Sequence, residues 1–349
     1  MVIKTTAQLD KLIREVLLAV GTDERNANRV AEALVLSTLR GVDTHGILHL
    51  PSYVEKIRDG EIVPTAWPQI RQEDATSALI AGNWTFGHVT AKYAMEVAIK
   101  KAESHNVAVV SAVQINHIGR LGEYAELAAA NGMLSIIWAG GFGAEKPVAV
   151  PFGGRQPVLS TNPIGIGFPV GDGPPMIIDY ATTVVAGSKV LTARDRNAQL
   201  PLGSIVDKDG NPSTDPMDYL EGGSLLPFGE HKGYALMLAV EFFGRILSGA
   251  DAFSNEKKRG GTIFRHSGVT MIVMKADLFQ SLTDYSTRIK DLGDQIRSVP
   301  PAPGFDEVLL PGDLEARAEA TRGRDGIPIA DALWERLEAL AESLGVDID

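Results

Sequence analysis

The stretch VAVVSAVQINHIGRLGEYAELAAANGMLSIIW, residues 107–138, decides the fold. Its first part, 107–113, and its last part, 133–138, are continuous apolar runs of the kind that form strands buried on both faces. The segment between them, 120–130, has the length and apolar spacing of a helix. The stretch therefore predicts two buried strands joined by a helix.

The same alternation extends outward from this stretch. Residues 77–81 predict a further strand, and 88–104 predict the helix that follows it. Strands that alternate with helices in this way predict an α/β core. Towards the C-terminus, 231–247 predicts a long buried helix and 269–274 another strand.

The first sixty residues are predicted to be helical. Apolar side chains recur at helical spacing in 9–20, and a second helix is predicted over 23–39 with Thr22 as its cap. A third helical stretch covers 47–57. The turn before it, Asp43-Thr44-His45-Gly46, carries three polar side chains between glycines.

Composition excludes several classes of protein. The 349 residues are 44% hydrophobic, which is enough for a large core and two lobes. The balance of 33 basic and 44 acidic residues argues against nucleic acid or an acidic membrane as a partner. The absence of cysteine excludes disulfides, thiolate metal sites and a cysteine nucleophile. No secretion signal or membrane-spanning run is visible, so we expect a cytoplasmic location.

Two of the seven histidines are candidates for acid–base chemistry. His45 lies in a turn, where a rigid scaffold presents catalytic groups, although the local pattern by itself favours a turn that only caps the next helix through Asp43 or Thr44. His117 lies between a buried strand and a helix, where α/β folds bind ligands, but it could also be a loop histidine bonded to backbone. Other histidines, such as His88, favour surface or capping roles.

Two features weakly indicate a phosphorylated cofactor. The loop Gly140-Gly141-Phe142-Gly143 follows a strand, as a phosphate-binding loop would. It lacks the complete G-x-G-x-x-G spacing, because Lys146 stands where the last glycine belongs. Lys232 and Gly233 open the predicted helix 231–247, and free N–H groups at a helix start favour an anion.

A different class of function is a metal-dependent hydrolase built on His45 and His49. These residues are four apart, so on a helix both imidazoles would share one face. The glutamate of the H-E-x-x-H motif is absent, because position 46 is glycine. Two histidines without a third ligand leave this hypothesis weak, and no metal is predicted.

Many short motifs, in order along nearly the whole chain, resemble the malate/L-lactate dehydrogenase family. The motifs are Arg40-Gly41-Val42-Asp43-Thr44-His45-Gly46, Leu50-Pro51-Ser52-Tyr53, Asn116-His117-Ile118-Gly119-Arg120-Leu121, Pro151-Phe152-Gly153-Gly154, Ser160-Thr161-Asn162-Pro163-Ile164, Ile178-Asp179-Tyr180-Ala181-Thr182-Thr183, Lys232-Gly233-Tyr234 and Pro311-Gly312-Asp313-Leu314-Glu315-Ala316-Arg317.

The resemblance implies an enzyme that transfers a hydride between NAD or NADP and a small 2-hydroxy acid or 2-oxo acid. It implies His45 as the proton donor and acceptor, with Asp179 completing the relay and Thr44 in place of the family's usual serine. His117 resembles a second active-site histidine, which some members use as the acid–base group. The alternative is an NADPH-dependent reductase of a cyclic ketimine or a diketo sugar acid.

The resemblance also implies which regions contact the cofactor and the substrate. The residues in cofactor-contacting positions are His117, Ile118, Gly119, Arg120, Leu121, Thr161, Asn162, Pro163, Lys232, Gly233, Pro311, Gly312 and Asp313. Thr161 and Tyr53 are implied to face the substrate as well.

One position departs from the family pattern. Four residues after the catalytic histidine, the family commonly has an arginine that binds the substrate carboxylate, whereas this chain has His49. A neutral imidazole lacks the two-pronged hydrogen bonding that arginine offers a carboxylate. Either Arg120 or another cation takes over that contact, or the substrate is not a simple malate-like or lactate-like acid.

The resemblance finally implies an architecture. We expect an α/β protein with the family's own NAD(P)-binding fold, unrelated to the Rossmann fold, with a mixed sheet and a helical lobe formed by the two termini. Residues 1–75 together with 300–349 would form the helical lobe, and 76–299 the α/β domain. The family also implies a homodimer.

Overall fold

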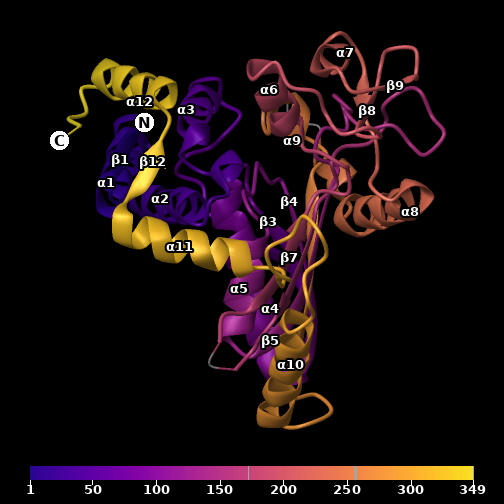
Figure 1. Ribbon diagram of the computed structural model, residues 1–349. Helices are drawn as coiled ribbons and strands as arrows, with labels where there is room; N and C mark the ends of the chain where they lie inside the picture. Colours follow the sequence, from indigo (N-terminus) through magenta and orange to yellow (C-terminus); the bar gives the residue numbers. More distant parts are fainter. Residues whose placement is uncertain (172, 255–257, 349) are drawn as a thin grey trace.

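A seven-stranded mixed sheet lies at the centre of the protein (Figure 1). The computed structural model describes residues 1–171, 173–254 and 258–348. In spatial order the strands are β2 (Gln69–Glu73), β3 (Ser77–Ala81), β4 (Val107–Val113), β11 (Gly268–Lys275), β5 (Met133–Gly140), β6 (Ile164–Phe168) and β7 (Met176–Tyr180). β3 and β4 run parallel, whereas the other neighbouring pairs run antiparallel. The predicted mixed α/β fold is confirmed.

Helices surround this sheet on several sides. The longer ones are α1 (Thr6–Ala19), α2 (Glu24–Leu39), α3 (Leu50–Arg58), α4 (Gly87–His105), α5 (Gly122–Ala130), α6 (Gly187–Asp195), α8 (Glu230–Glu241), α10 (Leu282–Arg297), α11 (Asp313–Asp325) and α12 (Asp331–Ser343). The short ones are η1 (Asp43–His45), η2 (Ile47–His49), α7 (Pro216–Leu220), the π-helical segment η3 (Phe242–Ile246), η4 (Ala250–Phe253) and α9 (Gly261–Phe264).

The central strands are covered on both faces, as their continuous apolar sequences predict. Because neighbouring side chains on a strand point to opposite faces, Met271 and Ile137 pack with α4 and α5, whereas Thr270 and Trp138 face η3. On that second face the Trp138 ring stacks on Phe243 with ring centroids 5.1 Å apart. The Thr270 hydroxyl donates to the Phe243 carbonyl at 2.7 Å.

The prediction of a long buried helix over 231–247 is wrong in its burial. α8 ends at Glu241 and continues as η3, which turns one face to the sheet and the other to solvent. Phe242 and Ile246 are more than half exposed there. Apolar composition alone did not distinguish a helix buried all round from one that leaves apolar side chains exposed.

The two ends of the chain share a second hydrophobic core. α1, α2 and α3 pack with α12, and β1 (Val2–Lys4) pairs with β12 (Ile327–Ile329). Figure 1 shows these indigo and yellow segments together at one side of the sheet. The cap of α2 differs from the prediction, because the Asp23 carboxylate accepts from the Asn26 amide at 2.8 Å while Thr22 is buried.

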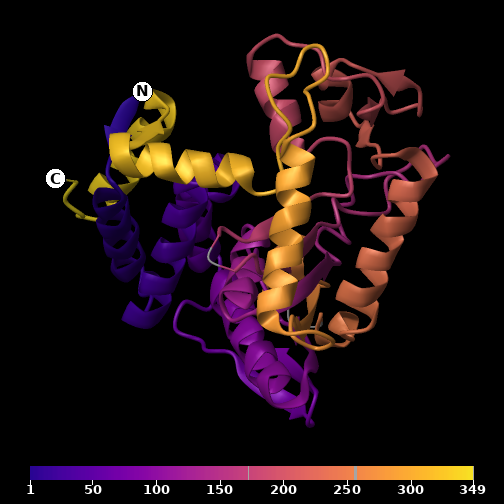
Figure 2. The same ribbon diagram turned by 60° about the horizontal axis from the view of Figure 1, so that its bottom comes forward.

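A third, smaller core lies beyond the end of the central sheet. It contains α6, α7 and the three-stranded sheet β10-β8-β9, with β8 (Ile205–Val206), β9 (Pro212–Ser213) and β10 (Ser224–Leu225). Figure 2 shows α11 running from the terminal helices towards α10 and the central sheet. β2, which falls within the predicted helical lobe 1–75, hydrogen-bonds to β3 of the central sheet. The division into a lobe and an α/β domain stays a prediction.

Within the described residues, no helix combines the length and the apolar character needed to cross a membrane.

Candidate active site

A cavity of about 940 Å³ opens between the terminal helices and the central sheet. Its wall combines His45 and His49 with the loop 117–121 after β4. Residues 177–181 at the end of β7, the start of α6, and residues 309–312 and 314–316 also line it. The cavity thus joins parts of the chain that lie far apart in sequence, including both regions that carry the candidate histidines.

Three imidazole rings converge on the wall of this cavity. The ring centroids of His45 and His117 are 5.7 Å apart, and those of His49 and His117 are 4.6 Å apart. His45 and His49 are 6.4 Å apart. The two regions that carry these histidines, which lie about seventy residues apart in the sequence, therefore form one cluster.

Each of these imidazoles has one fixed hydrogen-bond partner. The His49 Nε2 lies 2.8 Å from the Thr44 carbonyl oxygen. The Tyr53 hydroxyl lies 2.8 Å from the His117 Nδ1. The Thr44 hydroxyl lies 3.1 Å from the His45 Nδ1. A carbonyl partner only accepts, so the contact with Thr44 places the proton of neutral His49 on Nε2, whereas the hydroxyl partners of His45 and His117 can either donate or accept.

The cluster favours neutral imidazoles. Burial, helped by His49 and Arg120, lowers the pKa of His45 to about 4. Burial also lowers the pKa of His49, against the opposing effect of its bond to Thr44, and it holds the pKa of His117 well below its usual range. Neighbouring imidazoles add to the shifts of His45 and His117, because a protonated ring would repel the next one, whereas His49 is affected by the charge of Lys56.

The turn that carries His45 is held by its glycines and by Thr38. A side chain at Gly46 would place its Cβ 2.1 Å from the Thr38 hydroxyl, which accepts from the Ile47 amide at 3.1 Å. Asp43 pairs with Arg322 of α11, with Nη1 and Oδ1 2.6 Å apart. Neither Asp43 nor Thr44 caps the helix that follows, so the interpretation of this turn as a simple helix cap is wrong.

Tyr53 lies behind the histidines and does not line the cavity. Its side chain is 2% exposed, and its hydroxyl bonds to His117. His88, expected on the surface, is 1% exposed and packs against both Tyr53 and His117. Gly119 is close-packed against His88, since a Cβ there would lie 2.5 Å from its Nε2. Tyr53 and His88 therefore position His117.

Arg120 lines the cavity, and its guanidinium group is paired with the Glu126 carboxylate. Its Nη1 and Nη2 donate to the two carboxylate oxygens of Glu126 at 2.9 and 2.8 Å. Glu126 also accepts from Arg40, whose second amino group binds Glu319 at 2.9 Å. Arg120 is close enough to His45 to lower the pKa of that imidazole. Both arginines on this wall are thus bound by carboxylates.

Asp179 reaches the cavity but makes no hydrogen bond to His45 in the described part of the chain. One carboxylate oxygen accepts from the Gly122 amide at 2.7 Å. The side chain is open to the cavity yet enclosed by its walls, and this enclosure raises the pKa of Asp179 to about 6, against the opposing effects of Gly122 and Arg120. The expected relay from Asp179 to His45 stays a prediction.

The residues in cofactor-contacting positions divide into two groups. The residues on the cavity wall are His117, Ile118, Gly119, Arg120, Leu121, Thr161, Pro163, Pro311 and Gly312. Asn162 instead turns into the protein, where its amide donates to the Met237 carbonyl and to Glu241. Asp313 binds Arg297 and the Leu310 amide, so it holds the segment before α11. Lys232 and Gly233 start α8 outside the lining residues.

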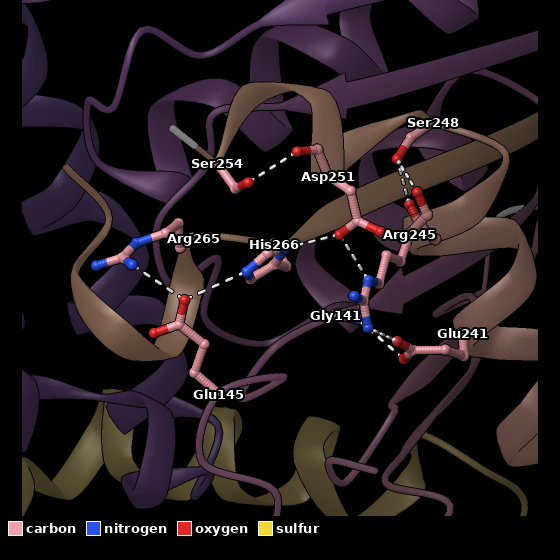
Figure 3. A network of polar contacts seen from close by, with 10 residues as sticks. Gly141, Glu145, Glu241, Arg245, Ser248, Asp251, Ser254, Arg265 and His266 are labelled. Carbon is pink, nitrogen blue, oxygen red and sulfur yellow. Dashed lines mark hydrogen bonds and ion pairs between the residues drawn. The ribbon is translucent and has the colours of Figure 1, made fainter. Parts of the chain in front are cut away.

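The amides of the 140–143 loop are used within the protein. The Gly141 amide donates to the Glu241 carboxylate at 3.0 Å. Figure 3 shows this carboxylate continuing into a network in which Arg245 joins Glu241 to Asp251, and His266 bonds to Asp251 at 2.8 Å. The Gly143 amide donates to the Ile263 carbonyl at 2.6 Å. Because two of the loop amides are already bound within the protein, the structure gives no support to the hypothesis that this loop binds phosphate.

Sequence reasoning missed the start of α6. Gly187, Ser188 and Lys189 all line the cavity, and no side chain caps this helix start. Uncapped amides beside a lysine suit a phosphate group. The only sequence signal was Ala186-Gly187-Ser188-Lys189, which matches none of the established phosphate-binding spacings.

The described residues contain no group of three or more histidine or carboxylate side chains placed to hold a metal ion. His49 uses one of its ring nitrogens on the Thr44 carbonyl.

Comparisons with known proteins agree on the family to which this chain is similar. The model of the malate/L-lactate dehydrogenase family matches residues 5–338. An L-sulfolactate dehydrogenase from Methanocaldococcus jannaschii is 36% identical over 340 residues, which are 97% of this chain and 96% of that enzyme.

Solved structures are similar over the same length. A structure of sulfolactate dehydrogenase from M. jannaschii aligns with a TM-score of 0.89, at 36% identity, over 99% of this chain and 98% of that chain. A structure of delta1-piperideine-2-carboxylate reductase from Pseudomonas syringae pvar. tomato aligns with a TM-score of 0.86, at 30% identity, over 98% of this chain and all of that chain.

Proposed function

The chain belongs to the malate/L-lactate dehydrogenase family, and on that premise we propose that it is an NAD- or NADP-dependent dehydrogenase of a small 2-hydroxy acid. One observation carries the proposal: His45, His49 and His117 converge on the wall of a single large cavity. Removing the hydroxyl proton of a secondary alcohol requires a base near neutral pH, and imidazole supplies one.

The cavity suits a dinucleotide together with a small acid. Its volume of about 940 Å³ lies at the upper end of the usual range for ligand pockets. Apolar side chains such as Ile177, Val184 and Leu310 offer surfaces for flat rings, while Lys189 and the uncapped start of α6 suit phosphate. When bound, the nicotinamide accepts or supplies the hydride.

The hydrogen bond from Tyr53 makes His117 a poor acid–base group. The buried Tyr53 hydroxyl has His117 Nδ1 as its partner in the described structure, so it donates to that nitrogen. The neutral His117 then carries its proton on Nε2, and its remaining lone pair is engaged by Tyr53. In this state His117 donates a hydrogen bond to a substrate oxygen but takes up no proton from it.

His45 is free to change its protonation state. Its Nδ1 faces the exposed Thr44 hydroxyl, which donates or accepts equally well. Neutral imidazole and imidazolium are therefore both accommodated, and Nε2 takes the substrate proton. We assign the acid–base step to His45, the orientation of its ring to Thr44, and the hydrogen bond to the substrate oxygen to His117.

We propose secondary roles for three further residues on the cavity wall. Asp179, aided by its raised pKa of about 6, would exchange protons with the histidine cluster. Arg120 keeps N–H groups that Glu126 does not use, and these would orient the substrate carboxylate. Thr161 would contact the substrate through its hydroxyl.

The activity is tested with a panel of 2-oxo and 2-hydroxy acids offered with each nicotinamide cofactor and followed by nicotinamide absorbance. We expect turnover of at least one 2-oxo acid and a change in NADH or NADPH fluorescence on binding. If the protein bound neither NADH nor NADPH, the proposal would be overturned. Δ1-Piperideine-2-carboxylate belongs in the panel, because the structural neighbour of that name supports a ketimine reductase as the second candidate.

The pH dependence should differ between the two directions. Burial lowers the pKa of His45 to about 4, so the protonated form needed for reduction is lost as pH rises above that value. We expect kcat/KM for reduction to fall about tenfold per pH unit above the pKa. Oxidation needs neutral His45, which is fully present over the same range, so its profile should not show this loss. If kcat/KM for oxidation fell with rising pH and kcat/KM for reduction did not, the acid–base role assigned to His45 would be contradicted.

A homodimer and a cytoplasmic location stay predictions. The exposed apolar side chains of η3, including Phe242 and Ile246, support burial of that surface against a second copy. Size-exclusion chromatography with light scattering measures the assembly directly.

A further inference from the structure

His49 has a defined tautomer. Its Nε2 lies 2.8 Å from the Thr44 carbonyl oxygen, and a carbonyl oxygen only accepts hydrogen bonds. The proton of a neutral His49 is therefore on Nε2, and Nδ1 carries a lone pair. A neutral imidazole in this arrangement offers the cavity a hydrogen-bond acceptor.

The surroundings of His49 keep it neutral near pH 7. Burial and the charge of Lys56 lower its pKa, against the raising effect of the Thr44 bond. The rings of His45, His117 and Tyr53 pack against His49, and the charged group that acts on it is Lys56. None of these supplies a negative charge that would stabilise an imidazolium.

The Nδ1 of His49 is available to a ligand. It makes no hydrogen bond within the part of the chain that the structure describes, and His49 lines the cavity. In His88, by contrast, both ring nitrogens are sealed inside the protein without a partner. The Nδ1 of His49 can therefore accept a hydrogen bond from a ligand in the cavity.

The nearby cations do not compensate for this acceptor. Arg120 is bound by Glu126, and Arg40 by Glu126 and Glu319. Among the described lining residues the third cation is Lys189, which belongs to the proposed phosphate site at the start of α6. Lys56, whose charge also acts on His49, is not among the residues that line the cavity, and its ammonium group lies over the Phe264 ring, 4.2 Å from the ring centroid. The remaining N–H groups of Arg120 are assigned to the first carboxylate of the substrate. A second carboxylate would thus meet the lone pair of His49 with no further cation among the described lining residues to balance its charge.

We propose that His49 sets the substrate class by accepting a hydrogen bond from a hydroxyl or N–H group on the tail of the 2-oxo acid, and that it excludes a second carboxylate. This inference rests on the proposed dehydrogenase function. It assigns to His49 a selection opposite to that of a residue with a free guanidinium, which would donate hydrogen bonds to a carboxylate.

Three 2-oxo acids that differ only at the fourth carbon test this selection. 2-Oxobutanoate carries a methyl group there, 4-hydroxy-2-oxobutanoate a hydroxymethyl group, and oxaloacetate a carboxylate. With the native enzyme we expect kcat/KM to be about tenfold higher for the hydroxyl than for the methyl substrate, as one hydrogen bond allows. We expect it to be lowest for oxaloacetate, by about a hundredfold relative to the hydroxyl substrate.

Two variants and one control locate the effect in His49. His49→Phe keeps a ring of similar size without the acceptor, so the hydroxyl-to-methyl ratio should fall to about one. His49→Arg should reverse the order in favour of oxaloacetate. His105→Phe, at the exposed end of α4, should keep the native ratios.

The ratio of kcat/KM for oxaloacetate to kcat/KM for 4-hydroxy-2-oxobutanoate gives a second readout. As pH falls through the lowered pKa of His49, its Nδ1 gains a proton, becomes a donor and attracts a carboxylate, so this ratio of kcat/KM values should rise with falling pH. Titration of His45 affects both substrates alike and cancels, and Tyr53 and Lys56 stay protonated throughout. In His49→Phe the ratio should stay flat.

The possible outcomes separate this inference from the function it rests on. A native preference for oxaloacetate, or an unchanged hydroxyl-to-methyl ratio in His49→Phe, would overturn the role of His49 while leaving the dehydrogenase intact. Failure to reduce any of the three acids, together with no binding of NADH or NADPH, would overturn the proposed function and this inference with it.

Discussion

Replacing His45 with asparagine is expected to lower kcat in both directions by about a hundredfold to ten-thousandfold, the usual contribution of a positioned acid–base group. Asparagine keeps a polar side chain on the cavity wall but neither takes up nor releases a proton near neutral pH. Because His45 contacts the reacting end of the substrate in our proposal, NADH or NADPH should still bind with near-native affinity. Steady-state kinetics and fluorescence titration measure the two quantities separately.

His117→Asn is the matched comparison for this prediction. His117 is proposed to donate a hydrogen bond rather than a proton, and asparagine can still donate one, so we expect a loss of only about tenfold. In His117→Asn the rate of reduction should still fall with rising pH. In His45→Asn the residual rate of reduction should no longer show this fall. A larger loss in His117→Asn than in His45→Asn would transfer the acid–base role to His117.

Replacing Arg29 with methionine is expected to lower the free energy of unfolding by about 3–5 kcal/mol, as when one member of a buried ion pair is removed. Arg29 of α2 is 7% exposed, and its Nη2 lies 2.5 Å from a carboxylate oxygen of Glu123 on α5. Its Nε also donates to the His88 carbonyl of α4 at 3.2 Å. The variant leaves the Glu123 carboxylate buried without its partner, between the terminal helices and the central sheet.

Urea unfolding measures this loss, and its pH dependence identifies the cause. Burial already raises the pKa of Glu123, and Arg29 opposes that shift. Without Arg29, the folded-state pKa rises further above the unfolded value, so the destabilisation is full at neutral pH and is relieved as pH falls and Glu123 takes up a proton. A loss that did not change with pH would point to packing instead.

Two variants serve as controls for the Arg29 experiment. Arg14→Met removes an ion pair with Asp10 in which both side chains are well exposed, and we expect less than about 1 kcal/mol. The double variant Arg29→Met, Glu123→Leu removes both buried charges and should recover much of the lost stability. If Arg29→Met were as stable as Arg14→Met, the link between the terminal helices and the sheet would lie elsewhere.

Much of the local structure was readable from the sequence. Strands β3, β4 and β5 are uniform apolar runs because the sheet is covered on both faces, and α1 and α12 show the spacing of helices with one buried face. Periodicity did not reveal that β11 lies between β4 and β5, because the order of strands depends on contacts between segments more than a hundred residues apart.

The sequence predicted which residues belong to the candidate site but not how they are arranged in space. The motifs around His45 and His117 placed both residues in the site, and the structure brings them to one cavity wall. The same motifs placed Tyr53 against the substrate, whereas the structure buries it behind His117. They did not reveal that Glu126 binds both Arg40 and Arg120.

The sequence by itself determined the α/β class, the exposed turn that presents His45, and the residue types available for acid–base chemistry, because these depend on local periodicity and on side-chain identity. Only the tertiary structure decided which nitrogen of His49 and of His117 carries the proton and which cations are bound by carboxylates. Those properties depend on single hydrogen bonds, such as His49 to Thr44 and Tyr53 to His117, and on burial. Both depend on how the α2–α3 turn packs against the loop after β4, which a one-dimensional pattern does not encode.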